Sequence, residues 1–180
     1  MWLIVVGHMS HAVAAIGAVT TLDPGATTKD VDRFRKFVPP RTSGPHAYAA
    51  LLGIETVDAP ALVKAIKKGF PYRTFERLCL NSSLPVARVM ALVGIPRRTM
   101  TRRKRDGRFL PDESDRLLRA SRLFGQTLAL FEGDRRAAAE WLTTAQQAFA
   151  GALPIDLAKT EIGAREVETL IGRLEHGIFP

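Results

Sequence analysis

The chain has 180 residues, 46% of them hydrophobic, which is enough to bury an ordinary core and excludes a chain that is disordered throughout. Its formal net charge of +8 favours a polyanionic partner. Nucleic acid fits better than a membrane, because no basic amphipathic helix with a large aromatic face accompanies the charge. The single cysteine, Cys79, excludes an internal disulfide framework and is typical of a cytoplasmic protein.

The first 45 residues mix Ala, Gly, Thr and Pro without a sustained period, and residues 39–45 form a turn-rich linker. We therefore predict a poorly structured arm over residues 1–45, in which residues 30–37 are the one candidate helix. The apolar stretch at residues 1–7 is short and lacks a charged flank, so we expect neither a signal peptide nor a membrane span.

The rest of the chain carries helical patterns separated by glycine and proline signals. They cover residues 61–68, 72–80, 85–93, about 96–105, 111–131, 135–149 and 163–176, with a loop over residues 151–156. Asp134 is the predicted N-cap of the helix over 135–149, and no segment alternates as a strand would. The predicted fold class is all-α.

Residues 84–108 have the pattern of a helix-turn-helix. Pro85 opens the first helix, Gly94 supplies a positive φ at the turn, and Pro96 presets the second helix. Ile95 and Met100 are expected to face inward. The predicted apolar face of the first helix consists of Val86, Val89, Met90 and Val93.

The second helix of this motif is crowded with bases. Residues 97–108 hold seven Lys and Arg against one Asp, so a charge of +6 lies on this stretch. Arginine neutralises phosphate and pairs bidentately with guanine. Most charge runs are only solvated faces, but this one coincides with a recognition helix, which favours DNA binding. The candidate DNA-binding residues are Arg97, Arg98, Thr101, Arg102, Lys104 and Arg105.

Enzymatic motifs are absent from the sequence. His8, His11, His46 and His176 do not combine with each other or with Cys79 at metal-site spacings. There is no phosphate-binding glycine loop and no nucleophile with a matching base. Glu166 and Glu168 have the positions of solvent-facing acids on the last helix. We therefore predict no catalytic residue, no metal site and no cofactor.

From about Gly69 to its end, the chain resembles the antitoxins of the Xre/MbcA/ParS group, whose partners are RES-domain toxins. The motifs that carry the resemblance are Gly94-Ile95-Pro96, Thr99-Met100, Arg102-Arg103-Lys104, residues 113–119, Trp141-Leu142, residues 153–157, Thr160, Gly163, Val167 and residues 174–177. Ala152, Ala158 and Gln146-Gln147 depart from the usual residues of the group.

The resemblance implies a homodimer with two functions and a predicted boundary near residue 131. Residues 46–131 would form the helix-turn-helix domain, bind operator DNA and repress the toxin-antitoxin operon. Residues 132–180 would form a small helical domain that grips the toxin and directs its tail toward the site of NAD consumption. The implied toxin-binding residues are Leu157, Thr160, Arg173, His176, Ile178, Phe179 and Pro180.

The residues alone leave other interpretations of the C-terminal part open. Residues 178–180 follow the glycine stop at Gly177, and an apolar end of this kind is either packed against its own domain, frayed, or bound to a partner. The alternative function is a dimeric helix-turn-helix repressor whose C-terminal domain dimerises or senses a ligand and has no toxin partner.

Overall fold

The computed structural model describes residues 46–54 and 58–177, so the predicted arm over residues 1–45 and its candidate helix lie outside the described residues. Within these ranges the regular elements are helices, and an isolated bridge between Pro71 and Arg108 is the sole β feature. The all-α prediction is confirmed. In chain order the elements are η1 (Ala47–Leu52), α3 (Ala59–Lys68), α4 (Arg73–Ser82), α5 (Val86–Val93), α6 (Arg97–Asp106), α7 (Pro111–Leu130), α8 (Arg135–Thr143), η2 (Gln147–Phe149), α9 (Pro154–Leu157) and α10 (Glu161–Glu175).

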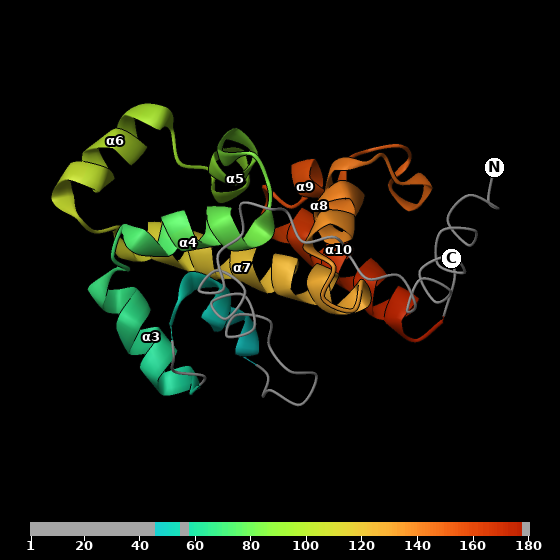
Figure 1. Cartoon of the computed structure of the whole chain (residues 1–180), viewed down its shortest axis with the longest axis horizontal. Coiled ribbons are helices and arrows are strands. Elements are labelled where there is room, and N and C mark those ends of the chain that lie inside the picture. The colour runs from blue at the N-terminus through green and yellow to red at the C-terminus, as the bar shows by residue number, and fades with distance from the viewer. Residues whose placement is uncertain (1–45, 55–57, 178–180) are drawn as a thin grey trace, which may run out of the picture. The chain divides into compact units, whose positions relative to one another are not determined.

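The long helix α7 is the element against which most of the others pack (Figure 1). Pro111 stands at its first turn together with Asp112 and Glu113, which is the composition that favours a helix N-terminus. Its apolar side chains contact η1, α3, α4, α5, α8 and α10. Among the described helices, none is both long enough and apolar enough to cross a bilayer.

The two helices of the helix-turn-helix begin and end within one residue of their predicted bounds, because their signals are local. Pro85 is the N-cap of α5, Gly94 takes the left-handed conformation at φ 61°, and Pro96 is the N-cap of α6. The predicted apolar face of α5 needs one correction. Val86 is 53% exposed, because α5 turns Val89, Leu92 and Val93 into the core instead.

The C-terminal elements differ from the prediction in two places. The helix after Asp134 ends at Thr143 and does not reach Phe149, since the Gln146 side-chain amide donates to the carbonyls of Trp141 and Thr144. The predicted loop over residues 151–156 contains the start of α9, which opens at Pro154. The last helix begins two residues earlier than predicted, where Thr160 caps it by accepting the amide N–H of Gly163.

Helices on both sides of the predicted boundary share one continuous hydrophobic core. Ion pairs reinforce this contact: Arg119 lies 2.6 Å from Glu161, and Arg122 lies 2.9 Å from Glu168. The prediction that Glu168 faces solvent is wrong, since its side chain is only 17% exposed. The division at residue 131 remains a prediction.

Candidate functional sites

The outward face of α6 carries the predicted DNA-binding side chains. Met100 is buried, whereas the predicted set Arg97, Arg98, Thr101, Arg102, Lys104 and Arg105 is exposed. Among the described residues, no carboxylate lies within 4.0 Å of the charged groups of Arg97, Arg98, Arg102 or Lys104. Arg105 has only an exposed contact of 3.6 Å with Asp106. The face therefore presents uncompensated positive charge to solvent.

The residues at the N-terminus of α6 do not stabilise the helix. A helix start favours acidic residues, but the first turn of α6 contains no acid and begins with Arg97 and Arg98. Pro96 provides no side-chain cap for the free amide groups. Free amides and arginines at one helix end are well suited to an anion such as a DNA phosphate.

Arg103 is the exception among the bases of this helix; the sequence analysis counted it in the local charge but not among the candidate DNA-binding residues. Its side chain is 8% exposed, and its Nε donates to the Glu113 carboxylate over 2.6 Å. The hydrogen bond to Glu113 raises the pKa of Arg103. Burial pushes the pKa of Glu113 upward, but the hydrogen bonds from Arg103 and from the Leu110 amide outweigh burial and leave it lowered. This arginine fixes α6 to α7 and is not available to a partner.

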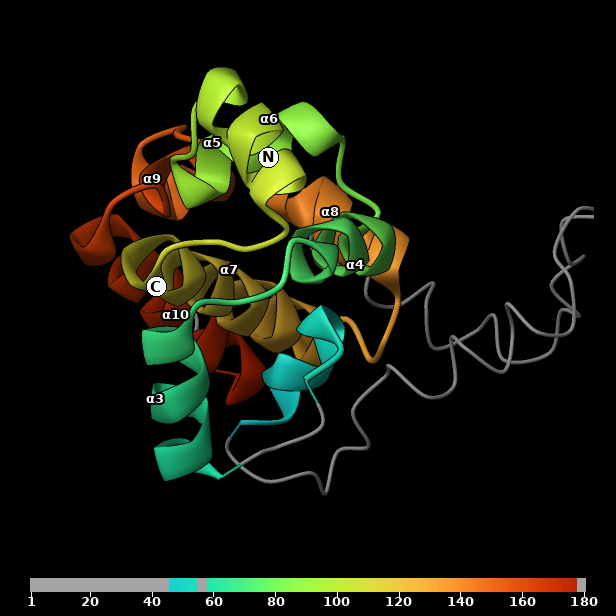
Figure 2. The ribbon, with the colours of Figure 1, turned by 90° about the vertical axis from the view of Figure 1, so that its left-hand side faces the viewer.

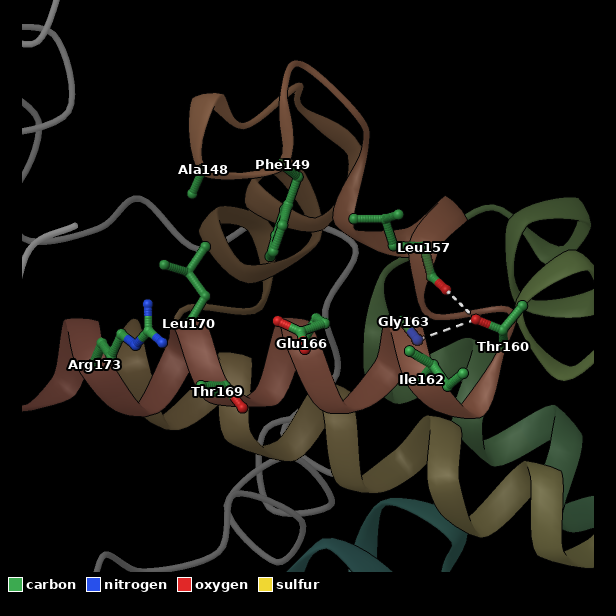
Figure 3. Close-up of a pocket in the computed structure, with 10 residues that line it drawn as sticks. All are labelled: Ala148, Phe149, Leu157, Thr160, Ile162, Gly163, Glu166, Thr169, Leu170 and Arg173. Carbon is green, nitrogen blue, oxygen red and sulfur yellow. Dashed lines mark hydrogen bonds between the residues drawn. The ribbon is translucent and has the colours of Figure 1, made fainter.

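A groove beside α10 brings together three of the predicted toxin-binding residues. Leu157, Thr160 and Arg173 line a groove of about 440 Å³ (Figure 3). His176 is exposed one turn further along, with its Nδ1 2.7 Å from the Gly172 carbonyl, and does not line the groove. Residues 178–180 lie outside the described residues.

Several groove residues were missed at the sequence level. On α10 the missed residues Ile162, Glu166 and Thr169 share one helical face with the predicted Arg173, at the spacing i, i+4, i+7, i+11. This face can be recognised in the sequence once the helix is known to begin at Glu161. Ile162 is 77% exposed, an unusual position for a large apolar side chain on a folded helix.

The junction of α9 and α10 is held by a close backbone approach at Gly163. A Cβ placed on Gly163 would lie 2.0 Å from the Leu157 carbonyl oxygen. The Gly163 amide donates to the Thr160 hydroxyl over 3.1 Å, and that hydroxyl donates to the Leu157 carbonyl over 3.3 Å (Figure 3). These contacts set the wall that Leu157 contributes to the groove.

Both surfaces, the α6 face and the groove, carry groups suited to non-covalent contacts. The described residues contain no cluster of three metal-ligating side chains. Burial raises the pKa of Cys79 to about 12, so the thiol stays protonated near neutral pH. The α6 face offers cationic and hydrogen-bonding groups, and the groove offers apolar walls with one carboxylate and one guanidinium, Glu166 and Arg173.

These features define a helix-turn-helix protein with a groove in its helical C-terminal part, and two known families match these parts of the chain. Residues 61–122 match the family described as the antitoxin Xre-like helix-turn-helix domain. Residues 126–177 match the antitoxin Xre/MbcA/ParS C-terminal toxin-binding domain. The chain belongs to the Xre antitoxin family, which confirms the resemblance seen in the sequence, and neither matching family is an enzyme family.

Three relatives carry the name Antitoxin Xre. The protein from Yersinia enterocolitica serotype O:8 / biotype 1B is 40% identical over 71% of this chain and 87% of the relative. The Photorhabdus laumondii protein is 31% identical over 71% of this chain and 86% of the relative. The Pseudomonas putida protein is 31% identical over 76% of this chain and 88% of the relative.

Proposed function

We propose that this protein is an antitoxin that neutralises a RES-domain, NAD-consuming toxin and, as a DNA-binding homodimer, represses its own toxin-antitoxin operon. The observation that carries the proposal is the separation of two chemically different surfaces. The α6 face is polar and cationic, and the groove beside α10 combines apolar side chains with hydroxyl groups, one carboxylate and one guanidinium. In support, α6 lies within residues 61–122, which match the helix-turn-helix family, and the groove residues lie within residues 126–177, which match the toxin-binding domain.

For the DNA-binding role, α6 enters the major groove of the operator. The exposed guanidinium groups of Arg98 and Arg102 reach base edges or phosphates, and Arg97 at the helix start contacts the backbone. Thr101 and the outer bases Lys104 and Arg105 complete the contact. A base contact contributes about 1–3 kcal/mol to discrimination between sequences.

For the toxin-binding role, the toxin contributes an apolar segment that fills the groove. Leu157, Thr160 and Arg173 contact that segment, and the exposed side chain of Ile162 extends the apolar surface. His176 and residues 178–180 follow directly along the chain. In this proposal they reach the toxin beyond the groove and obstruct the site at which it consumes NAD.

The experiment impairs the two surfaces one at a time and measures operator binding and toxin neutralisation for each variant. Arg102→Ala should weaken operator binding by about 5- to 150-fold, the equivalent of about 1–3 kcal/mol, and leave toxin neutralisation intact. Ile162→Glu, and separately deletion of residues 173–180, should abolish protection of NAD from a RES-domain toxin and leave operator binding intact. Both readouts are taken on all variants, with circular dichroism to confirm folding.

Leu80→Glu is the matched control for the groove variant. Leu80 is 64% exposed on α4 and does not line the groove, so this change should leave neutralisation unaffected. If wild-type protein binds operator but protects no NAD and captures no RES-domain toxin, the alternative function replaces this one: a dimeric repressor whose C-terminal part dimerises or senses a ligand.

A further inference from the structure

The basic charge of this chain extends well beyond α6. Residues 59–110 hold thirteen Lys and Arg against two acids, whereas residues 111–177 hold eight Lys and Arg against eleven acids. Within the basic segment, Arg103 pairs with Glu113 and Arg88 lies 3.7 Å from Asp156. Of the six remaining bases outside α6, three belong to one other helix.

That helix is α3, which is amphipathic with a lysine face. Lys64, Lys67 and Lys68 have the i, i+3, i+4 spacing of one helical face, and all three are exposed. On the other side Leu62 is buried, and the helix packs against α7. Within the described part of the chain no carboxylate lies within 4.0 Å of any of these lysines.

Backbone contacts tie the C-terminal end of α3 to the C-terminal end of α6. The Phe109 amide donates to the Phe70 carbonyl over 2.8 Å, and the Tyr72 amide donates to the Gly107 carbonyl over 2.9 Å. The Arg108 guanidinium donates to the carbonyls of Lys68 and Gly69. Both helices lie at the left-hand end of the described helices in Figure 1, and Figure 2, which faces that end, shows α6 above and α3 below.

The close approach of the two segments depends on Gly69. It takes φ 82°, and a Cβ placed on it would lie 2.2 Å from the Phe109 carbonyl oxygen. Only glycine fits there without moving one of the two chain segments. The position of the lysine face relative to α6 is therefore built into the fold.

The internal stability of the helices accounts for only part of this charge. Lys67 and Lys68 stand in the last turn of α3, where a base also complements the helix dipole. Lys64 lies in the middle of α3 and gains nothing there. Arg73 is exposed at the first position of α4, next to the Tyr72–Gly107 contact, where the dipole disfavours a base.

We propose that the lysine face of α3, formed by Lys64, Lys67 and Lys68, is a second and sequence-independent contact with DNA, placed on phosphates that flank the site bound by α6. Lysine is a point charge on a flexible stem, suited to phosphate and poorly suited to bidentate reading of a base. The inference rests on the proposed operator binding. In it, α6 discriminates between DNA sequences, and α3 adds affinity by neutralising phosphates.

The test is the salt dependence of binding to operator and to scrambled DNA by the full-length chain. Each lost phosphate contact reduces the slope of log K against log salt concentration by about 0.9. The triple variant Lys64→Gln, Lys67→Gln, Lys68→Gln should therefore lose a slope of up to about 2.7 for both DNAs, with an unchanged ratio of the two affinities. The triple change to Arg should keep the wild-type slope.

A charge-matched control separates contact from overall charge. Arg136, Lys159 and Arg165 are exposed in the C-terminal part, and their combined change to Gln removes the same formal charge. This control should retain most of the slope. An α3 triple variant that is folded and keeps the wild-type slope, or that loses no more than the control, overturns the proposal. If wild-type protein fails to prefer operator over scrambled DNA, the proposed repressor function fails as well, and only that result implicates it.

Discussion

Arg103 Nε and the Glu113 carboxylate lie 2.6 Å apart, with both side chains less than a tenth exposed, and the same carboxylate oxygen accepts the Leu110 amide N–H over 2.8 Å. One carboxylate thus holds the recognition helix α6 and caps the start of α7. Removing Arg103 would leave the Glu113 carboxylate buried without this cation, whereas removing Glu113 would leave Arg103 with a 3.5 Å contact to the half-exposed Asp106.

The first prediction concerns this pair. Arg103→Met leaves the Glu113 carboxylate buried without its cation and should lower the free energy of unfolding by about 3–5 kcal/mol. Combining it with Glu113→Gln removes the charge but keeps an acceptor for the Leu110 amide, so the double variant should regain more than half of the loss. Urea denaturation measures both.

Arg105→Met is the control for that experiment, because Arg105 is 81% exposed on the same helix. Its effect on unfolding should stay within about 0.5 kcal/mol. Equal losses from Arg103→Met and Arg105→Met would show that the buried pair has no special role.

The second prediction is a pH dependence. The pKa of Glu113 is lowered in the folded protein. The stabilisation from its charged form is therefore complete above the ordinary carboxyl pKa of 4.5 and is lost as the pH falls through the lower folded value. Urea midpoints of wild type and Glu113→Gln should differ most near neutral pH and converge as the pH falls through the lowered pKa of Glu113. A constant difference across the range would contradict the assignment.

The third prediction uses two glycines of α10. Gly163→Ala should destabilise the protein and weaken toxin binding, because its Cβ would meet the Leu157 carbonyl at 2.0 Å and push α9 away. Gly172→Ala has open space and should stabilise the helix by about 0.5–1 kcal/mol. Thermal melts and a toxin pulldown test the pair together. A neutral Gly163→Ala would refute the tight junction.

The fourth prediction concerns assembly. A single α6 contacts too little DNA for tight specific binding, so we expect a two-fold dimer whose half-sites lie about 34 Å apart or a multiple of that distance. The operator should be an inverted repeat protected on both arms in a footprint. A monomer in sedimentation at micromolar concentration, protecting one unrepeated site, would rule this out.

The sequence predicted the helix-turn-helix well because its boundaries depend on neighbouring residues. Pro85, Gly94 and Pro96 act through their own φ angles, so no distant contact is needed to place them. The exposed face of α6 followed from the same periodicity. That this face binds DNA is a proposal, because exposure alone does not identify a ligand.

The remaining features depend on contacts that the sequence does not display. The sequence analysis assigned Arg103 no partner, and only the fold brings Glu113 to it from the next helix. The end of the helix after Asp134 was missed because the Gln146 side chain caps it from the following loop. The groove lies where η2, α9 and α10 come together, and no one of these segments contains it.

The long helix α7 limits how proteins of this architecture can exchange their parts. One helix supports α5 of the DNA-binding motif and also carries Arg119 and Arg122, which pair with α10. A chimera joined near residue 131 would set these arginines against a foreign helix, and the two ion pairs would be lost wherever that helix has no acid in place of Glu161 and Glu168. A chimera that exchanges only the C-terminal part therefore needs matching residues on α7 and α10.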